Sequence, residues 1–440
     1  MKQKRKKVSS TGRHKTIQKG KQPSRPTDTE DTHENSEEMT DQEKEEALKL
    51  LKSKNFLYGV GQHLERGGLA GERRNGLIVY LSNTSRIQKD PISLVVKGQS
   101  ATGKNYLVRT VAQFLPGSAY KELTGMTRQA LLYSNESFAH TVVLICESEG
   151  MEDALYNIRA MQSEGKLILD TVRGSKGEHI EKEGPVSFIV TTTAPMIHVE
   201  NETRNWSIFM DESDKQTKRI KDKIARDHSQ TSVDLSFLTV YQNAQRLLKN
   251  YPVKIPYARF LSEKTPNKPL RMRRDFGKLL AAIETITLLH QFQRKTKKDK
   301  DAQYLLATLE DYYMAATLLG PTFKESLSGK SQWTQKIVDS IFSLFEKNEK
   351  RPVTSKEIED HLKISRDTIE RWIRPAIEAG EVEVRGSRGR IAKTYSPGER
   401  RDWIRGAGLP DPKELAKAFP SLPGSASMID PITGARVVIR

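Results

Sequence analysis

Three short apolar runs constrain the fold of this 440-residue chain more than any other feature. They are residues 93–97 (SLVVK), 141–146 (TVVLIC) and 188–193 (FIVTTT), and each has the length of one buried strand. Helical patterns over residues 48–66 and 75–84 precede the runs, and further ones over 106–114 and 151–163 separate them. Apolar strands separated by helices favour a parallel sheet that helices cover on both faces. The sequence therefore predicts an α/β fold.

The loop after the first strand is rich in small residues. It reads Gly98, Gln99, Ser100, Ala101, Thr102, Gly103, Lys104 and Asn105. Glycines let the backbone fold around a phosphate group with its N–H groups toward the oxygens, and the start of the next helix adds a favourable dipole. Between a strand and a helix, this pattern places Lys104 to reach the β- and γ-phosphates. The loop predicts nucleotide binding.

An acid follows the second apolar strand. Glu147 resembles the acid of a Walker B strand, which faces the phosphates from the carboxyl end of the sheet. We expect it to orient an attacking water; the alternative is an exposed acid at a strand end. Asn105 stands where Ser or Thr usually holds Mg²⁺, and Cys146 where Asp usually does. We therefore expect a Mg²⁺ site with few protein ligands, Asn105 and Glu147. We expect Cys146 to be a small buried side chain.

The charge of the chain favours a polyanionic partner. Lys and Arg number 73 against 56 Asp and Glu, which leaves +17. Nucleic acid or an acidic membrane surface would match this surplus; the alternative is a solvated basic tail. Residues 1–25 carry only basic charges and residues 26–46 are mostly acidic, so both are expected to be disordered.

Several classes of protein are excluded by composition. No run approaches the roughly 18 apolar residues that a membrane span needs. The charged N-terminus lacks the apolar region of a secretory signal. A single cysteine, Cys146, rules out an intramolecular disulfide framework and a multi-cysteine zinc site. We expect a reducing, cytoplasmic compartment and no membrane partner.

Four further stretches accompany the loop: residues 68–75 (GLAGERRN), 80–86 (YLSNTSR), 183–193 (EGPVSFIVTTT) and 198–204 (HVENETR). With the loop, they make residues 48–290 resemble AAA+ ATPases of the pre-sensor-1-insert branch, which includes the minichromosome-maintenance helicases. The resemblance is strongest to the primase- or helicase-like ATPases of phages and mobile elements. It covers about half of the chain.

The resemblance implies roles for several residues. Thr192 or Thr193 would be sensor 1, which contacts the γ-phosphate or the attacking water, and the choice among these two and Thr191 stays open. Arg204 matches a trans-acting arginine finger; the alternative is a surface salt bridge. Arg273, at the start of a lid helix, matches sensor 2.

Residues 168–182 have the pattern of a strand, a turn and a strand. They resemble the hairpin that contacts DNA in the central channel of this branch. Lys176 would lie at the tip and Lys182 on the returning strand, where cations follow the DNA backbone without reading its sequence. The alternative is a solvated lysine in a turn.

Residues 331–397 have the pattern of three helices and a hairpin. They resemble a winged helix–turn–helix, with residues 366–379 as recognition helix and 386–390 as wing. The expected DNA contacts are Arg366, Arg371, Arg374, Arg388 and Arg390. The alternatives are a winged helix that binds protein and a solvated hairpin.

The sequence thus predicts five parts. They are a disordered arm (1–47), an AAA+ core with a parallel sheet (48–214), a helical lid or linker (215–330), a winged helix (331–397) and a Pro-rich tail that is extended or loosely docked (398–440). The expected function is a DNA-dependent ATPase, with ATP and Mg²⁺ as cofactors. It would act as a replicative helicase or initiator of a phage or mobile element, in a homo-oligomeric ring for which a hexamer is one option. The alternatives are an ATP-gated DNA-binding regulator or helicase loader that does not unwind DNA, and a structural protein without turnover.

Overall fold

The computed structural model describes most of the chain after Met39. The described residues are 39–123, 134, 137–146, 152–173, 176–194, 203–229, 234–267, 271–300, 302–328, 332–378, 380–386, 393–398, 409–425 and 427–439. Glu147, Arg388 and Arg390 lie outside them, as do residues 1–38, so the predictions made there stay predictions.

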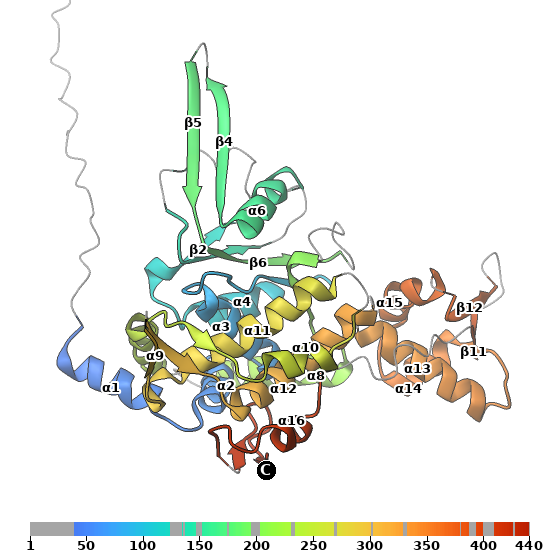
Figure 1. Ribbon diagram of the computed structural model, residues 1–440. Helices are drawn as coiled ribbons and strands as arrows, with labels where there is room; N and C mark the ends of the chain where they lie inside the picture. The colour runs from blue at the N-terminus through green and yellow to red at the C-terminus, as the bar shows by residue number, and fades with distance from the viewer. Residues whose placement is uncertain are drawn as a thin grey trace, which may run out of the picture. The chain divides into compact units, whose positions relative to one another are not determined.

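Most of the longer strands lie between β1 and β7, and helices dominate after β7 (Figure 1). The helices are α1 (Asp41–Leu51), α2 (Phe56–Arg66), α3 (Arg73–Ser85), α4 (Lys104–Ala112), α6 (Glu152–Glu164), α8 (Asp214–Ser229), α9 (Phe237–Leu247), α10 (Ala258–Lys264), α11 (Met272–Leu289), α12 (Leu309–Ser328), α13 (Gln332–Lys347), α14 (Ser355–Leu362), α15 (Arg366–Glu378) and α16 (Pro412–Ala418). The strands are β1 (Leu94–Lys97), β2 (Tyr120–Leu123), β3 (Thr141–Ile145), β4 (Lys166–Arg173), β5 (Lys176–Glu183), β6 (Val186–Thr192), β7 (Trp206–Phe209), β8 (Val253–Lys254), β9 (Lys297–Lys298), β10 (Gln303–Leu306), β11 (Val353–Thr354), β12 (Val382–Arg385), β13 (Thr394–Pro397), β14 (Ser427–Ile429) and β15 (Arg436–Val438).

A five-stranded parallel sheet forms the centre of the fold, in the order β2-β3-β6-β1-β7. Side chains alternate across β3: Val142 and Leu144 join the apolar core shared with α3, α4 and α11, whereas Val143 and Ile145 join a second core with α6 and β4. Figure 1 shows α6 and the β4–β5 hairpin on one side of the sheet and α3, α4 and α11 on the other. The prediction of a parallel sheet covered on both faces is confirmed.

The two edge strands were not predicted. β2 (YKEL) is half-buried and carries two charges, and β7 alternates buried and half-buried positions, so neither has the continuous apolar run of a central strand. β7 pairs with β1 in parallel, with Leu94 opposite Trp206. The strand that leads into the small-residue loop therefore has a neighbour on each side.

The N-terminal helical region begins earlier than predicted. Residues 41–46 belong to α1, although their acidic character led us to expect disorder. The hydroxyl of Thr40 accepts the N–H of Glu43, whose carboxylate accepts the N–H of Thr40, so a capping box starts the helix. The predicted helix over 48–66 is interrupted between α1 and α2.

Residues 332–398 contain α13, α14 and α15 and an antiparallel sheet in the order β11-β13-β12. Their core includes Ile341, Ile358, Ile369 and Trp372. A second capping box, Thr354 with Glu357, starts α14. The predicted order of three helices and a hairpin is confirmed.

Residues 409–425 and 427–439 are folded, and for this part of the chain the expectation of an extended or loosely docked tail was wrong. Leu415 and Leu422 belong to the main apolar core. The hydroxyl of Tyr312 donates to the carbonyl oxygen of Pro410 at 2.6 Å, and that of Tyr313 donates to Asp430 at 3.0 Å. The five prolines of this segment led us to expect an extended chain. Pro412, however, lies at the first position of α16, where proline is compatible with a helix start.

Within the described ranges, none of the helices combines the length and the apolar character needed to cross a bilayer.

Candidate functional site

The small-residue loop leaves the carboxyl end of β1 and enters α4 directly. Gly103 has φ +86°, a conformation that favours glycine. A Cβ atom at Gly98 would lie 2.7 Å from Oγ1 of Thr102, so this position leaves no room for a side chain. The Thr102 hydroxyl also donates to the carbonyl oxygen of Gln99 at 2.8 Å, which closes the turn. The two glycines thus permit the tight path that a phosphate-binding loop needs.

Lys104, the first residue of α4, is directed into this loop. Its Nζ donates to the carbonyl oxygens of Gly98 (3.0 Å) and Gln99 (2.7 Å), and the residue is only 7% exposed. The N-cap of α4, Gly103, has no side chain to bond the first-turn N–H groups. These N–H groups, the helix dipole and the ammonium together form a site suited to an anion.

The end of β6 lies beside the end of β1, with Thr192 opposite Lys97. The buried Thr191 donates its hydroxyl to Oδ1 of Asn105 at 2.8 Å. By contrast, the hydroxyl of Thr192 accepts the N–H of Ala194 at 3.1 Å. Of Thr191 and Thr192, Thr191 is therefore the residue whose hydroxyl contacts the loop helix.

The predicted magnesium site has one described candidate ligand, Asn105, whose oxygen already accepts a bond from Thr191. Burial raises the pKa of the Cys146 thiol to about 11, and the thiol donates to Glu122 at 3.4 Å, so Cys146 is a buried neutral group as expected. No group of three or more His, Cys, Asp or Glu suited to a metal occurs among the residues that the structure covers. Asn105 would hold Mg²⁺ together with phosphate oxygens and water.

Glu212, which follows β7, also contacts the loop and was not predicted. Its Oε1 accepts the N–H of Gln99 at 2.8 Å, and its Oε2 lies 3.5 Å from Nε1 of Trp372. The N–H of Gln99, which a phosphate could use, thus already has a carboxylate as its acceptor. No local pattern marks Glu212, since it lies 113 residues after Gln99 in the chain.

The helix α15 reaches the same place from the C-terminal unit. Nε2 of Gln99 donates to Oγ1 of Thr368 at 3.0 Å, and the guanidinium of Arg371 donates to the carbonyl oxygen of Thr193. Burial lowers the pKa of Arg371, which Glu212 partly offsets. The sequence predicted a DNA contact for Arg371, but the structure places this side chain against the end of β6.

Arg204 and Arg273 lie at the opposite edge of the sheet. They line a cavity of about 860 Å³ together with Ser93 and Val186, which lie where β1 and β6 begin. Because the strands are parallel, this edge is remote from the loop, which lies where β1 ends. Nε of Arg204 donates to Oγ of Ser163 at 2.9 Å. The structure therefore does not bring Arg204 or Arg273 to the loop of the same chain.

Lys278 adds to the positive charge of that cavity. Its Nζ donates to Asp275 at 2.8 Å and to the carbonyl oxygen of Asn205 at 3.2 Å. Burial lowers the pKa of Lys278 to about 8, against the effect of Asp275. Lys278 is therefore mostly protonated at pH 7. Together with Arg204 and Arg273, it lines the cavity with positive charge.

The predicted hairpin is confirmed as β4 and β5, paired from Lys166 opposite Glu183 to Arg173 opposite Lys176. Lys176 therefore lies at the end of the ladder; only its backbone is described. Lys182 is half-buried and donates to the carbonyl oxygen of Ser134. Figure 1 shows the hairpin extending away from the central sheet.

The remaining arginines of α15 are exposed. Nε of Arg366 lies 3.2 Å from Glu370, one turn further along the helix, and its side chain is 57% exposed. Arg374 is also exposed. These two residues are on the solvent side of α15, whereas Arg371 is directed to the end of β6.

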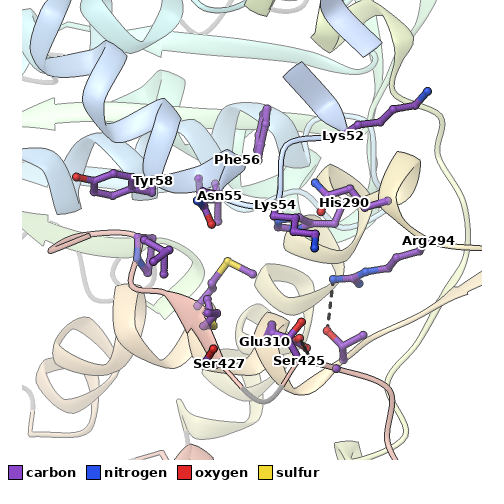
Figure 2. A pocket seen from close by; sticks show the side chains of 18 of the residues that line it. Lys52, Lys54, Asn55, Phe56, Tyr58, His290, Arg294, Glu310, Ser425 and Ser427 are labelled. Atoms are coloured by element: carbon purple, nitrogen blue, oxygen red, sulfur yellow. Dashed lines mark hydrogen bonds between the residues drawn. The ribbon is translucent and has the colours of Figure 1, made fainter. Parts of the chain in front are cut away.

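A separate cavity of about 700 Å³ lies where the α1–α2 connection, the end of α11 and the C-terminal segment meet. Figure 2 shows Lys52, Lys54 and Arg294 around it, with Glu310 and Ser425 nearby. Two nitrogens of Arg294 each lie 2.6 Å from a carboxylate oxygen of the buried Asp311. This pairing neutralises Arg294, so we assign the cavity no part in the candidate site.

Compared with models of known protein families and with curated proteins, the chain matches none.

Proposed function

We propose that this protein is a DNA-dependent ATPase that acts as a replicative helicase or initiator of a phage or mobile element. The observation that carries the proposal is the loop of residues 98–105, which surrounds the buried ammonium of Lys104 at the carboxyl end of β1. Backbone N–H groups and a lysine in this arrangement suit the phosphates of ATP. The resemblance to AAA+ ATPases adds the expectation of Mg²⁺ as cofactor.

The proposed hydrolysis uses three groups of this chain. Lys104 binds the β- and γ-phosphates, Glu147 orients the attacking water, and Thr191 positions Asn105. When bound, Mg²⁺ would neutralise part of the phosphate charge. Positioning and electrostatic stabilisation account for most of the catalysis in such sites.

The place of Arg204 supports a site shared between subunits. Its guanidinium lies at the edge of the sheet where the strands begin, so it is poorly placed for the phosphates of its own chain. In a ring of identical subunits, this cationic edge can face the loop of the next subunit. An arginine supplied in trans contributes about 10³–10⁵-fold to the rate in enzymes of this kind.

Two parts of the chain are proposed to bind DNA. Lys176 and Lys182 belong to the β4–β5 hairpin, and the exposed Arg366 and Arg374 belong to α15. We interpret residues 332–398 as a winged helix because three helices and a three-stranded antiparallel sheet share one core there. Cations on exposed hairpins and helices bind the DNA backbone independently of sequence.

One observation favours the alternative of an ATP-gated regulator or loader. Cys146 is neutral, and the oxygen of Asn105 already accepts a bond from Thr191, so among the described residues few groups are available for Mg²⁺. A site of this kind favours nucleotide binding over rapid turnover.

A strand-displacement assay on a forked DNA substrate separates the two functions. A helicase is expected to release the strand with ATP, whereas Glu147→Gln should retain ATP but release no strand. Arg204→Ala should lose activity alone and regain it in mixed oligomers with Lys104→Ala subunits, because each variant supplies what the other lacks. ATP and DNA binding without strand release would favour the regulator.

A further inference from the structure

One face of α15 lies against the phosphate-binding loop. Thr368, Arg371 and Trp372 are spaced three and four residues apart, so they share a side of the helix. Thr368 accepts a bond from Gln99 at 3.0 Å, and Trp372 lies 3.5 Å from Glu212, which itself accepts the N–H of Gln99. The C-terminal unit therefore touches the loop at its second residue.

Arg371 lies within this contact at the end of β6. Its guanidinium donates to the carbonyl oxygen of Thr193, one residue beyond the strand. The preceding residues Thr191 and Thr192 are beside Asn105 and Lys97, respectively. The guanidinium is thus at the carboxyl edge of the sheet, where the loop holds its anion.

The electrostatic environment of Arg371 is suited to an anion. Burial lowers its pKa, yet a guanidinium stays charged in proteins. The carbonyl oxygen of Thr193, which accepts from Arg371, is neutral. Among the described residues, Glu212 compensates the charge of Arg371 only in part, because Glu212 also accepts the N–H of Gln99. A phosphate oxygen would give Arg371 the charge-assisted bond that the carbonyl oxygen does not provide.

We propose that Arg371 binds the terminal phosphate of the nucleotide held by the loop of the same chain. The start of α4 holds the inner phosphates and Lys104 binds the β- and γ-phosphates, and a cation at the end of β6 adds a second contact to the outermost phosphate. Arg371 is then a catalytic residue that the C-terminal unit supplies, and it gives the chain its preference for ATP over ADP. This inference rests on the proposed ATPase function.

Calorimetric titration of the full chain with ATPγS and with ADP tests the inference. Arg371→Ala should weaken ATPγS binding by about 10–100-fold, the usual effect of losing a charged hydrogen bond. ADP binding should change by less than about 3-fold, which also shows that the site is folded. Arg371→Lys keeps the charge without the planar fork of the guanidinium. Its affinity for ATPγS should lie between those of the wild-type chain and Arg371→Ala. Lys356→Ala removes an exposed cation from α14 and serves as the matched control.

The outcomes separate this inference from the function on which it rests. If Arg371→Ala weakens the binding of ATPγS and ADP equally, or of neither, Arg371 does not bind the terminal phosphate. ATP binding that depends on Lys104 would still support the proposed ATPase function. If the wild-type chain binds neither nucleotide, both proposals fail. A selective loss of ATPγS affinity, with partial recovery in Arg371→Lys, supports the inference.

Discussion

The contact between Thr191 and Asn105 offers a quantitative test of how β6 positions the loop helix. Thr191→Val removes the hydroxyl and keeps the shape of the side chain. The hydroxyl is fully buried and donates to Asn105 Oδ1 at 2.8 Å. Losing a buried hydrogen bond between neutral groups costs about 1–2 kcal/mol when the acceptor is left without its donor. We expect Thr191→Val to lower the free energy of unfolding by this amount.

A double-mutant cycle isolates the bond from other effects. Asn105→Ala also changes the helix propensity of α4, and Thr191 makes further contacts; both contributions cancel in the cycle with the double variant. Urea midpoints, compared at a common slope, should give a coupling of about 1 kcal/mol between the two positions. The matched pair Thr192→Val and Asn105→Ala should show none, because the Thr192 hydroxyl accepts the N–H of Ala194.

A coupling below about 0.3 kcal/mol, the usual error of additivity, would refute this reasoning. Thr191 would then not position Asn105, and the sensor role would return to Thr192 or Thr193.

Three further predictions concern other parts of the chain. Burial, with a smaller effect of Asp90, raises the pKa of Glu284 to about 6 from 4.5, so its charged form destabilises the fold above pH 6. Glu284→Gln should therefore be more stable at pH 7 by at most about 2 kcal/mol, and this gain should disappear as the pH falls through 6 to 4.5; an equal gain at pH 4 would contradict it. Thr354→Ala removes the N-cap of α14 and the partner of Glu357, and should lower the unfolding free energy by about 1 kcal/mol in urea titrations; an unchanged midpoint would show that the cap adds nothing. Lys176→Ala should reduce the slope of log affinity against log salt for duplex DNA by about 0.9, measured by fluorescence anisotropy; an unchanged slope would place Lys176 off the DNA.

The central strands and their helices were predictable because continuous apolar runs leave few alternatives to a buried parallel strand. The loop was equally clear, since Gly98 and Gly103 occupy positions where the backbone requires glycine or leaves no space for a side chain. The edge strands β2 and β7 lack such runs. Their pairing depends on contacts across the sheet that the local sequence does not encode.

The missed parts of the site come from distant segments. Glu212 contacts the loop because β7 lies next to β1, and Arg371 contacts the end of β6 because α15 packs over Gln99. Local periodicity carries no information about such contacts. It did predict that α15 is an amphipathic helix, but not which arginine faces the loop and which faces solvent.

Two local signals were available and were outweighed by composition. The spacing of Thr40 and Glu43 is that of a capping box, yet the surrounding acidic residues indicated disorder. Asp411 followed by Pro412 is a good helix start, yet the number of prolines indicated an extended tail. In both places, a specific pair of residues was more informative than the average composition.

The most direct test of the proposed function is the rate of phosphate release from ATP by the full chain, compared with Lys104→Ala. Lys104 lies inside the loop and is not one of the residues proposed to bind DNA. We predict hydrolysis by the wild-type chain that DNA accelerates, and its loss in Lys104→Ala at every DNA concentration. Hydrolysis that survives this substitution, or no hydrolysis by the wild-type chain with any DNA, would contradict the account.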